Sequence, residues 1–129
     1  FMHHEMIPTV EGTFLTLEYV PLDAEFSRQI RGGVRQRLSV PMMGDDVVEF
    51  DREGQELSRI STWKYLDPRK DPINPLQDRR EWSHANSVDL MPNGNVVVSC
   101  RHVSRVVILD RAKEALVWKS KRGEFSLQH

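Results

Sequence analysis

The chain has 129 residues, of which 39% are hydrophobic and 29% are charged, and its formal net charge is −1 at pH 7. This length supports one ordinary hydrophobic core, and the near-neutral charge gives no reason to expect nucleic acid or an anionic membrane as a partner. No apolar run approaches the roughly 18 residues of a membrane-spanning helix, and the single cysteine excludes an internal disulfide.

The first 62 residues predict two pairs of short strands separated by an insertion. Residues 4–8 and 13–17 flank a turn at Gly12. Residues 47–61 predict a strand, a charged turn that opens on an Asp-Arg pair, and a second strand. An aspartate at the start of a turn bonds the backbone ahead of it, and the β-branched residues before it favour a strand.

The insertion, residues 21–41, has a less regular pattern. Residues 23–29 predict a short helix that Gly32 and Gly33 would end, and residues 34–40 predict a strand.

Residues 63–81 predict a long loop rather than a strand, because Pro68, Pro72 and Pro75 interrupt a highly charged segment. Long loops at one end of a β scaffold commonly carry the residues that build a site. This loop is therefore a candidate to contribute to one.

Residues 82–102 predict a β-hairpin that reverses at the Pro-Asn-Gly turn of residues 92–94. His84 lies nine residues before Asn93 and Arg101 lies eight residues after it, so both fall at the same end of the hairpin. Such a pair is suited to anions, because the planar guanidinium binds sulfate, phosphate or carboxylate. The plainer interpretation is that His84 caps the loop before the strand and Arg101 pairs with a surface carboxylate.

The neighbours of this pair have two interpretations each. Strand alternation directs His102 and Cys100 away from Arg101, so His102 is predicted to be structural and Cys100 a small buried apolar residue. Asn86 is either a turn residue at the strand entry or one that orients the site. Trp82 packs beside the site or lines an aromatic substrate pocket. We predict that Asn86 and Trp82 contact the substrate.

An internal repeat links the two halves of the chain. Residues 47–61 align without gaps on residues 106–120 at an offset of 59, and Val, Val, Asp, Arg, Leu and Ser recur. A weaker repeat relates the strands that begin at His4 to those that begin at His84. Tandem four-stranded units are typical of a β-propeller. We therefore predict an all-β chain of about two four-stranded antiparallel blades, with a small α+β domain or a sandwich as the alternative.

The predicted organisation has three parts. Residues 1–62 form one propeller blade with the insertion at 21–41, residues 63–81 form the proline-rich charged loop, and residues 82–129 form a second blade and the start of the next. Because the chain begins without an initiator methionine and stops without a closing element, we expect it to be an internal fragment of a longer protein. Two blades cannot close a ring, so the isolated chain is expected to be inactive and prone to aggregate.

Further histidines occupy comparable positions in the predicted blades. Since blades converge on a central channel, His4, His84 and His129 are expected to meet in one pocket, where Arg101 joins them. Three histidines can bind a divalent metal, but a nearby arginine repels a cation, and Glu5 is the only carboxylate at an equivalent position. An anion site is therefore favoured over a metal site.

Five short motifs carry a family resemblance. They are His-His-Glu at 3–5, Glu-Trp-Ser-His-Ala-Asn-Ser at 81–87, Val-Ser-Cys-Arg-His at 98–102, the strand pair at 110–118 and Gln-His at 128–129. At these motifs the chain resembles the aryl-sulfate sulfotransferase family, bacterial enzymes built on a six-bladed propeller. The resemblance covers nearly the whole chain as about two consecutive blades. The chain departs from the family pattern at Cys100, where serine is usual, and at Glu5, where aspartate is usual.

The resemblance implies a reaction. Family members move a sulfuryl group from a phenolic sulfate ester to a phenol through a transiently sulfated histidine, with ping-pong kinetics and without a nucleotide sulfate donor. The implied partners are a small-molecule phenolic sulfate donor and a phenol acceptor, with no cofactor. The location that the resemblance implies is periplasmic or secreted.

The resemblance also implies roles for individual residues. His129 matches the Gln-His motif of the nucleophile, and His84 matches the histidine that serves as acid and base or as a sulfate ligand. Arg101 matches the arginine that stabilises negative charge on the sulfuryl oxygens. His4 matches the histidine of the preceding blade, and His3 is the alternative at that position and otherwise a substrate contact.

Two other functions fit the same residues. A propeller binding module would hold a sulfated or carboxylated ligand without turnover, because a fold does not determine a function. A metal-dependent propeller hydrolase would use the histidines as ligands. Ligand retention without turnover would favour the binding module, and activity that survives chelation would count against the hydrolase.

Overall fold

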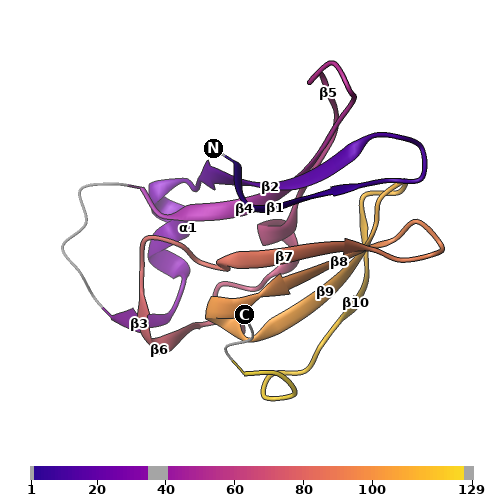
Figure 1. Ribbon diagram of the computed structural model, residues 1–129. Helices are drawn as coiled ribbons and strands as arrows, with labels where there is room; N and C mark the ends of the chain where they lie inside the picture. Colours follow the sequence, from indigo (N-terminus) through magenta and orange to yellow (C-terminus); the bar gives the residue numbers. More distant parts are fainter. Residues whose placement is uncertain (1, 35–40, 127–129) are drawn as a thin grey trace.

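Two four-stranded antiparallel sheets carry most of the computed structural model, which describes residues 2–34 and 41–126 (Figure 1). The first sheet, called the first unit below, has the order β1 (Met2–Pro8), β2 (Phe14–Pro21), β4 (Met43–Phe50) and β5 (Glu56–Ser61). The second sheet, called the second unit, contains β7 (Ala85–Leu90), β8 (Val96–Cys100), β9 (Arg105–Asp110) and β10 (Ala115–Lys119) in that order. The all-β prediction is confirmed, and two such meanders fit a propeller-like fold.

The charged turn of the repeat opens on an aspartate that bonds the backbone in both units, although the bonds differ in detail. In the first unit, the Asp51 carboxylate accepts hydrogen bonds from the backbone N–H groups of Glu53 and Gln55, at 3.0 and 2.7 Å. In the second unit, the Asp110 carboxylate accepts one from the backbone N–H of Lys113 at 2.9 Å. Each aspartate thus closes its turn by bonding the backbone ahead of it. The predicted strand–turn–strand repeat is confirmed.

The hairpin of β7 and β8 reverses at residues 92–94, as predicted. Its register pairs Ala85 with Cys100, so His84 and Arg101 are the next residues outward on the two strands. The backbone N–H of Arg101 donates to the carbonyl oxygen of His84 at 3.1 Å. The prediction that both residues lie at one end of the hairpin is confirmed.

The insertion contains the predicted helix, α1 (Ala24–Gln29). The helix begins after Asp23, whose carboxylate accepts a hydrogen bond from the backbone N–H of Phe26 at 2.9 Å, as N-cap residues do. It is capped at Ile30, before the two glycines that were expected to end it. None of the helices in the described ranges is long and apolar enough to cross a membrane.

The insertion and the proline-rich loop pair with each other beside the two units (Figure 1). β3 (Gly32–Val34) runs parallel to β6 (Ile73–Asp78), and a short 3₁₀ helix, η1 (Thr62–Tyr65), begins the loop. The prediction that residues 63–81 hold no strand is therefore wrong. β6 tolerates Pro75 because it belongs to a two-stranded sheet and leaves one edge unpaired.

Gly32 permits the pairing of β3 with β6. Its φ is +83°, and a Cβ at this position would lie 2.0 Å from the carbonyl oxygen of Ile73. Only glycine combines this backbone conformation with so close an approach. Of the strand predicted over residues 34–40, Val34 belongs to β3 and residues 35–40 lie outside the described residues.

Buried side chains of both units form one hydrophobic core. Its fully buried members include Leu15, Leu17 and Val47 from the first unit and Val88, Val96, Val98, Val107 and Leu109 from the second. Strand β9 alternates buried and half-buried residues, as expected when one face of a sheet packs on a core. β1 and β7, the first strands of the two units, lie side by side (Figure 1). This contact brings the beginnings of the two units together.

A buried carboxylate attaches the proline-rich loop to the second unit. The fully buried side chain of Asp71 accepts hydrogen bonds from Nε of Arg105 at 2.7 Å and from Nζ of Lys119 at 2.9 Å. The backbone carbonyl of Asp71 accepts a hydrogen bond from Nε1 of Trp82 at 2.9 Å. Trp82 is itself fully buried, and its ring meets that of Phe26 edge-on, with 5.6 Å between centroids.

Candidate functional site

Histidine rings from the two units lie in one row. His3 and His4 belong to β1, His84 directly precedes β7, and His102 belongs to a 3₁₀ turn, η2 (Arg101–Val103). Successive ring centroids lie 5.0 Å apart from His3 to His4, 5.2 Å from His4 to His84 and 4.5 Å from His84 to His102. The structure therefore brings together the histidines at which the two units begin. We call these four residues the histidine row.

The backbone is left-handed at the equivalent histidine of each unit. φ is +60° at His4 and +45° at His84, a region that residues other than glycine enter at an energetic cost. His4 also lies in a register shift of the β1–β2 pairing, and such bulges redirect side chains. In both units a left-handed backbone conformation thus directs one histidine side chain away from the regular alternation of the strand.

Glu81 holds the ring of His84. Nδ1 of His84 is hydrogen-bonded to Oε2 of Glu81, and the hydroxyl of Tyr19 donates to the same oxygen at 3.0 Å. Burial raises the pKa of Glu81, but the hydrogen bond and charge of His84 outweigh it, so the net pKa lies below the ordinary value. Burial, and then the charge of Glu81, raise the pKa of Tyr19. At neutral pH the pair is therefore a carboxylate and a protonated phenol.

Asp45 holds both neighbours of His84 and also contacts His3. This fully buried carboxylate accepts hydrogen bonds from the hydroxyl of Ser83 and from the backbone N–H of Ala85, the latter at 3.0 Å. Its other oxygen lies 3.0 Å from Nε2 of His3, a close contact that is not aligned as a hydrogen bond. One carboxylate from β4 thereby binds the Ser83 side chain on one side of His84 and the Ala85 backbone on the other.

His102 contacts His84, which strand alternation did not predict, and its structural role stays a prediction. Strand β8 ends at Cys100, and the 3₁₀ turn that follows breaks the two-residue alternation on which the prediction depended. The ring of His102 stacks on that of His84 with an interplanar angle of 14°, and its Nδ1 is 3.1 Å from the carbonyl oxygen of Glu81. Burial lowers the pKa of His102, and so does the charge of His84.

Arg101 keeps hydrogen-bonding capacity for an anion. Its Nη1 donates to Oε1 of Gln77 on β6 at 3.1 Å, and its Nε is buried without a hydrogen-bond partner in the part of the chain that the structure describes. Nor does its guanidinium form an ion pair with any carboxylate of residues 2–34 or 41–126, which was the plainer interpretation of this residue. A buried guanidinium N–H is a strong donor to sulfate, phosphate or carboxylate.

The remaining predicted site residues have different surroundings. Asn86 is buried at the start of β7, next to the histidine row in the chain. Trp82 is buried in the core, where its hydrogen bond to Asp71 supports the loop, and its predicted contact with substrate stays a prediction. His129 lies outside the described residues. Cys100 is fully buried, and burial raises the pKa of its thiol, so the prediction of a buried apolar residue is confirmed.

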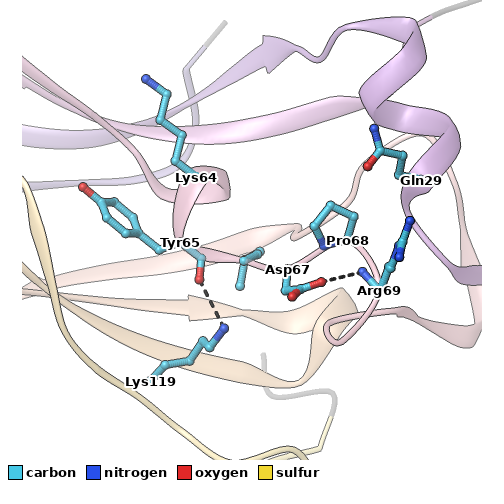
Figure 2. Close-up of a pocket in the computed structure, with 8 residues that line it drawn as sticks. Gln29, Lys64, Tyr65, Asp67, Pro68, Arg69 and Lys119 are labelled. Atoms are coloured by element: carbon cyan, nitrogen blue, oxygen red, sulfur yellow. Dashed lines mark hydrogen bonds between the residues drawn. The ribbon is translucent and has the colours of Figure 1, made fainter.

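Two hollows show where small molecules have room. One of about 280 Å³ opens beside the histidine row and is lined by Met2, His3, His4, Glu5, Met6 and Thr16. Another of about 430 Å³ contains no residue of the histidine row (Figure 2). In this second hollow, Lys119 points to the backbone carbonyl of Tyr65 (Figure 2). Its Nζ donates to that oxygen at 3.2 Å and also to the Asp71 carboxylate at 2.9 Å. Its charge is thus already neutralised, and the first hollow is the better candidate.

The histidine row, with Arg101 beside it, is chemically suited to proton transfer next to a bound anion. Imidazoles take up and release protons near neutral pH, and an oriented ring does so at a defined nitrogen. Across the described ranges, no group of three or more His, Cys, Asp or Glu residues is arranged to hold a metal ion. His102 is the site residue that sequence reasoning missed. The available signal was the four-residue interval between Cys100 and Arg105, a usual hairpin connection, in which strand alternation no longer holds.

A protein-family match covers nearly the whole chain. The family model described as Arylsulfotransferase (ASST) matches residues 1–126, nearly the whole chain. No curated protein matches the chain. The matched range includes both units and all four members of the histidine row.

Proposed function

The chain belongs to the arylsulfotransferase family, and on that premise we propose that it transfers a sulfuryl group from a phenolic sulfate ester to a phenol through a sulfated histidine. The observation that carries the proposal is the meeting of His4 and His84, from two different units, with 5.2 Å between ring centroids. The backbone N–H of Arg101 donates to the carbonyl oxygen of His84, so a side chain that can bind an anion begins next to His84. No nucleotide sulfate donor and no cofactor take part in the proposed reaction.

The proposed first step forms a bond between sulfur and the nitrogen of a neutral imidazole while the bond from sulfur to the phenolic oxygen breaks. His129, outside the described residues, is the proposed nucleophile. Arg101 stabilises the negative charge on the sulfuryl oxygens. The electron pair of the broken bond stays on the phenoxide, which receives a proton from His84 or His4. In the second step the histidine that gave its proton, His84 or His4, takes the proton of the incoming phenol. The phenol oxygen attacks sulfur, the bond from sulfur to nitrogen breaks, and the nucleophilic imidazole is released.

We further propose that the two units are consecutive blades of a larger propeller, the first within residues 1–62 and the second within residues 82–129, a range that also holds the start of the next blade. Exposed apolar side chains on the last strand support this arrangement, because propeller blades pack against neighbours on both faces. Leu116, Val117 and Trp118 of β10 are 40%, 53% and 43% exposed. In such a ring the histidine row lies where the first strands of neighbouring blades meet.

The test is an assay of the full-length protein with a chromogenic aryl sulfate and a phenol acceptor, with and without a chelator. We expect acceptor-dependent phenol release that survives chelation. His84→Ala is expected to lower kcat by about 10²–10⁴-fold, because general acid–base catalysis contributes that much. Arg101→Ala is also expected to lower kcat, whereas Arg122→Ala, at an exposed turn arginine, serves as the matched control.

Two results would overturn the proposal. Retention of a phenolic sulfate without release of phenol would indicate a binding module for an anionic ligand. Phenol release that a chelator abolishes would indicate a metal-dependent hydrolase. His129→Ala adds a direct test of the nucleophile, since a variant that still exchanges sulfuryl groups between phenols excludes this residue from the covalent step.

A further inference from the structure

One glutamate organises both histidines of the second unit. The side chain of Glu81 is bonded to Nδ1 of His84, and the backbone carbonyl of the same residue is bonded to Nδ1 of His102 at 3.1 Å. A carboxylate and a carbonyl oxygen only accept hydrogen bonds. Both imidazoles must therefore carry a proton on Nδ1. In neutral histidine this leaves Nε2 as the basic nitrogen.

The glutamate is itself held by the first unit. The hydroxyl of Tyr19, on β2, donates to Oε2 of Glu81 at 3.0 Å. The ring of Tyr19 stacks on His3 with 3.7 Å between centroids and an angle of 7°, and His3 contacts the buried Asp45. Tyr19 thus has a fixed ring and a fixed hydroxyl. The position of the Glu81 carboxylate depends on packing in one unit, and the ring that it orients belongs to the other.

The charge state of the pair suits this task. The pKa of Glu81 is raised by burial but lowered by more through its bonds to His84 and Tyr19, so the group is ionised at neutral pH. Tyr19 has a raised pKa and stays a donor. His84 is about one-fifth exposed, with a side-chain exposure of 19%, and its Nε2 makes no hydrogen bond to any described residue. That nitrogen is the one available to a substrate.

We propose that Glu81 is a positioning residue for sulfuryl transfer, which fixes the Nδ1–H form of His84 and presents Nε2 to the phenolic oxygen, with Tyr19 holding the carboxylate. This inference rests on the proposed function for its kinetic consequence. Loss of the carboxylate lets the His84 ring exchange tautomers and rotate. Because misplacement of a reacting group by about 1 Å costs on the order of 10²-fold in rate, kcat should fall by about that factor while KM changes little.

The experiment combines histidine ¹⁵N NMR with kinetics on the full-length protein. In the unaltered protein, the His84 resonances, assigned by their loss in His84→Ala, should show a protonated Nδ1 in both charge states of the ring. Nε2 should be unprotonated in the neutral form and protonated in the charged form that donates to the leaving phenoxide. Glu81→Ala should mix the two tautomers and lower kcat. Tyr19→Phe keeps the ring that stacks on His3 and removes only the hydroxyl, so we expect a smaller fall in kcat of about 5- to 10-fold. It also tests the idea if Glu81→Ala does not fold.

The matched control is Glu49→Ala. Glu49 is a partly buried carboxylate that accepts hydrogen bonds from the hydroxyls of Thr13 and Ser58, but it lies near the charged turn of the first unit. This control should leave the His84 tautomer and kcat unchanged. An Nδ1 that stays protonated in both Glu81→Ala and Tyr19→Phe overturns the positioning role. An equal fall in kcat for Glu49→Ala also overturns it. Tautomer mixing in a protein that transfers no sulfuryl group would overturn the proposed function alone.

Discussion

The two units share a strand plan and differ in one connection at the end where the histidines lie. In the first unit, residues 22–42 join β2 to β4 and include α1 and β3. In the second unit, residues 101–104 join β8 to β9 through a single 3₁₀ turn. The long connection packs beside the sheets, whereas the short one places Arg101 and His102 at the histidine row. The repeated sheet thus places equivalent strand ends at the histidine row, and the length of the connection between two strands determines which side chains lie there.

The units also differ in how their charges are arranged. At the second unit, Asp71 of the proline-rich loop is fully buried and pairs with Arg105 and Lys119. In the first unit, Arg59 is 32% exposed and pairs with three carboxylates, those of Glu18, Asp46 and Glu56. Water and salt screen the exposed Arg59 cluster but not the buried Asp71 cluster. The variants below test this difference and the difference in connections, beginning with the largest expected effect.

Asp71→Ala should cause the largest loss of stability, because it leaves two buried or half-buried cations without their carboxylate. Removal of one partner of a buried ion pair costs about 3–5 kcal/mol. Urea unfolding of the full-length protein measures the loss. Asp71→Asn keeps the shape and an acceptor oxygen and should lose less. A loss as small as that of an exposed ion pair would show that water enters and replaces the carboxylate.

Gly32→Ala and Gly54→Ala separate backbone strain from crowding. Both glycines have a φ of +83°, but a Cβ at Gly54 meets no atom within 4 Å, whereas at Gly32 it meets the Ile73 carbonyl. Gly54→Ala should cost about 1–2 kcal/mol for the left-handed backbone alone. Gly32→Ala should cost about 1–3 kcal/mol more, because the clash separates β3 from β6. Equal unfolding free energies for the two variants would show that the long connection is not held by this pairing.

Arg59→Ala should cost about 1 kcal/mol at low salt, because exposed ion pairs contribute little. The loss should shrink at high salt, since screening weakens the pairs in the unaltered protein. Urea unfolding at two salt concentrations checks both statements. Arg52→Ala is the control, since Arg52 is exposed and, among the described residues, its side chain donates only to the carbonyl of Gly12. A loss of unfolding free energy that does not change with salt would contradict the statement that solvent and salt screen the Arg59 cluster.

The smallest expected effect is the loss, in His102→Asn, of a pH dependence of stability below neutral pH. Burial lowers the pKa of His102 from its ordinary value of 6.5, so between the two pKa values the unfolded chain binds more protons than the folded one. The stability of the unaltered protein should therefore fall as the pH drops through 6.5 and level off below the folded pKa. Asparagine keeps a donor for the Glu81 carbonyl but does not titrate. Urea midpoints that follow the same pH curve in both proteins would contradict this role.

Local patterns in the sequence predicted most of the sheet structure. β-branched runs before Asp51 and Asp110, the turn at residues 92–94 and the capped helix after Asp23 all depend on neighbours in the chain. Strand periodicity and turn chemistry act over a few residues, so a single sequence carries them. The repeat added the equivalence of the two units, and with it the expectation that His4 lies near His84.

Tertiary structure decided the features that join distant segments. The pairing of β3 with β6 depends on an approach between Gly32 and Ile73, which no local pattern records. The stacking of His102 on His84 depends on a 3₁₀ turn at a place where strand alternation would direct the ring elsewhere. Alternation holds only while a strand stays paired, and pairing between distant segments is a property of the whole packed chain. The sequence alone therefore determined the two units and their histidines, and the packing of the units determined which of those histidines share one site.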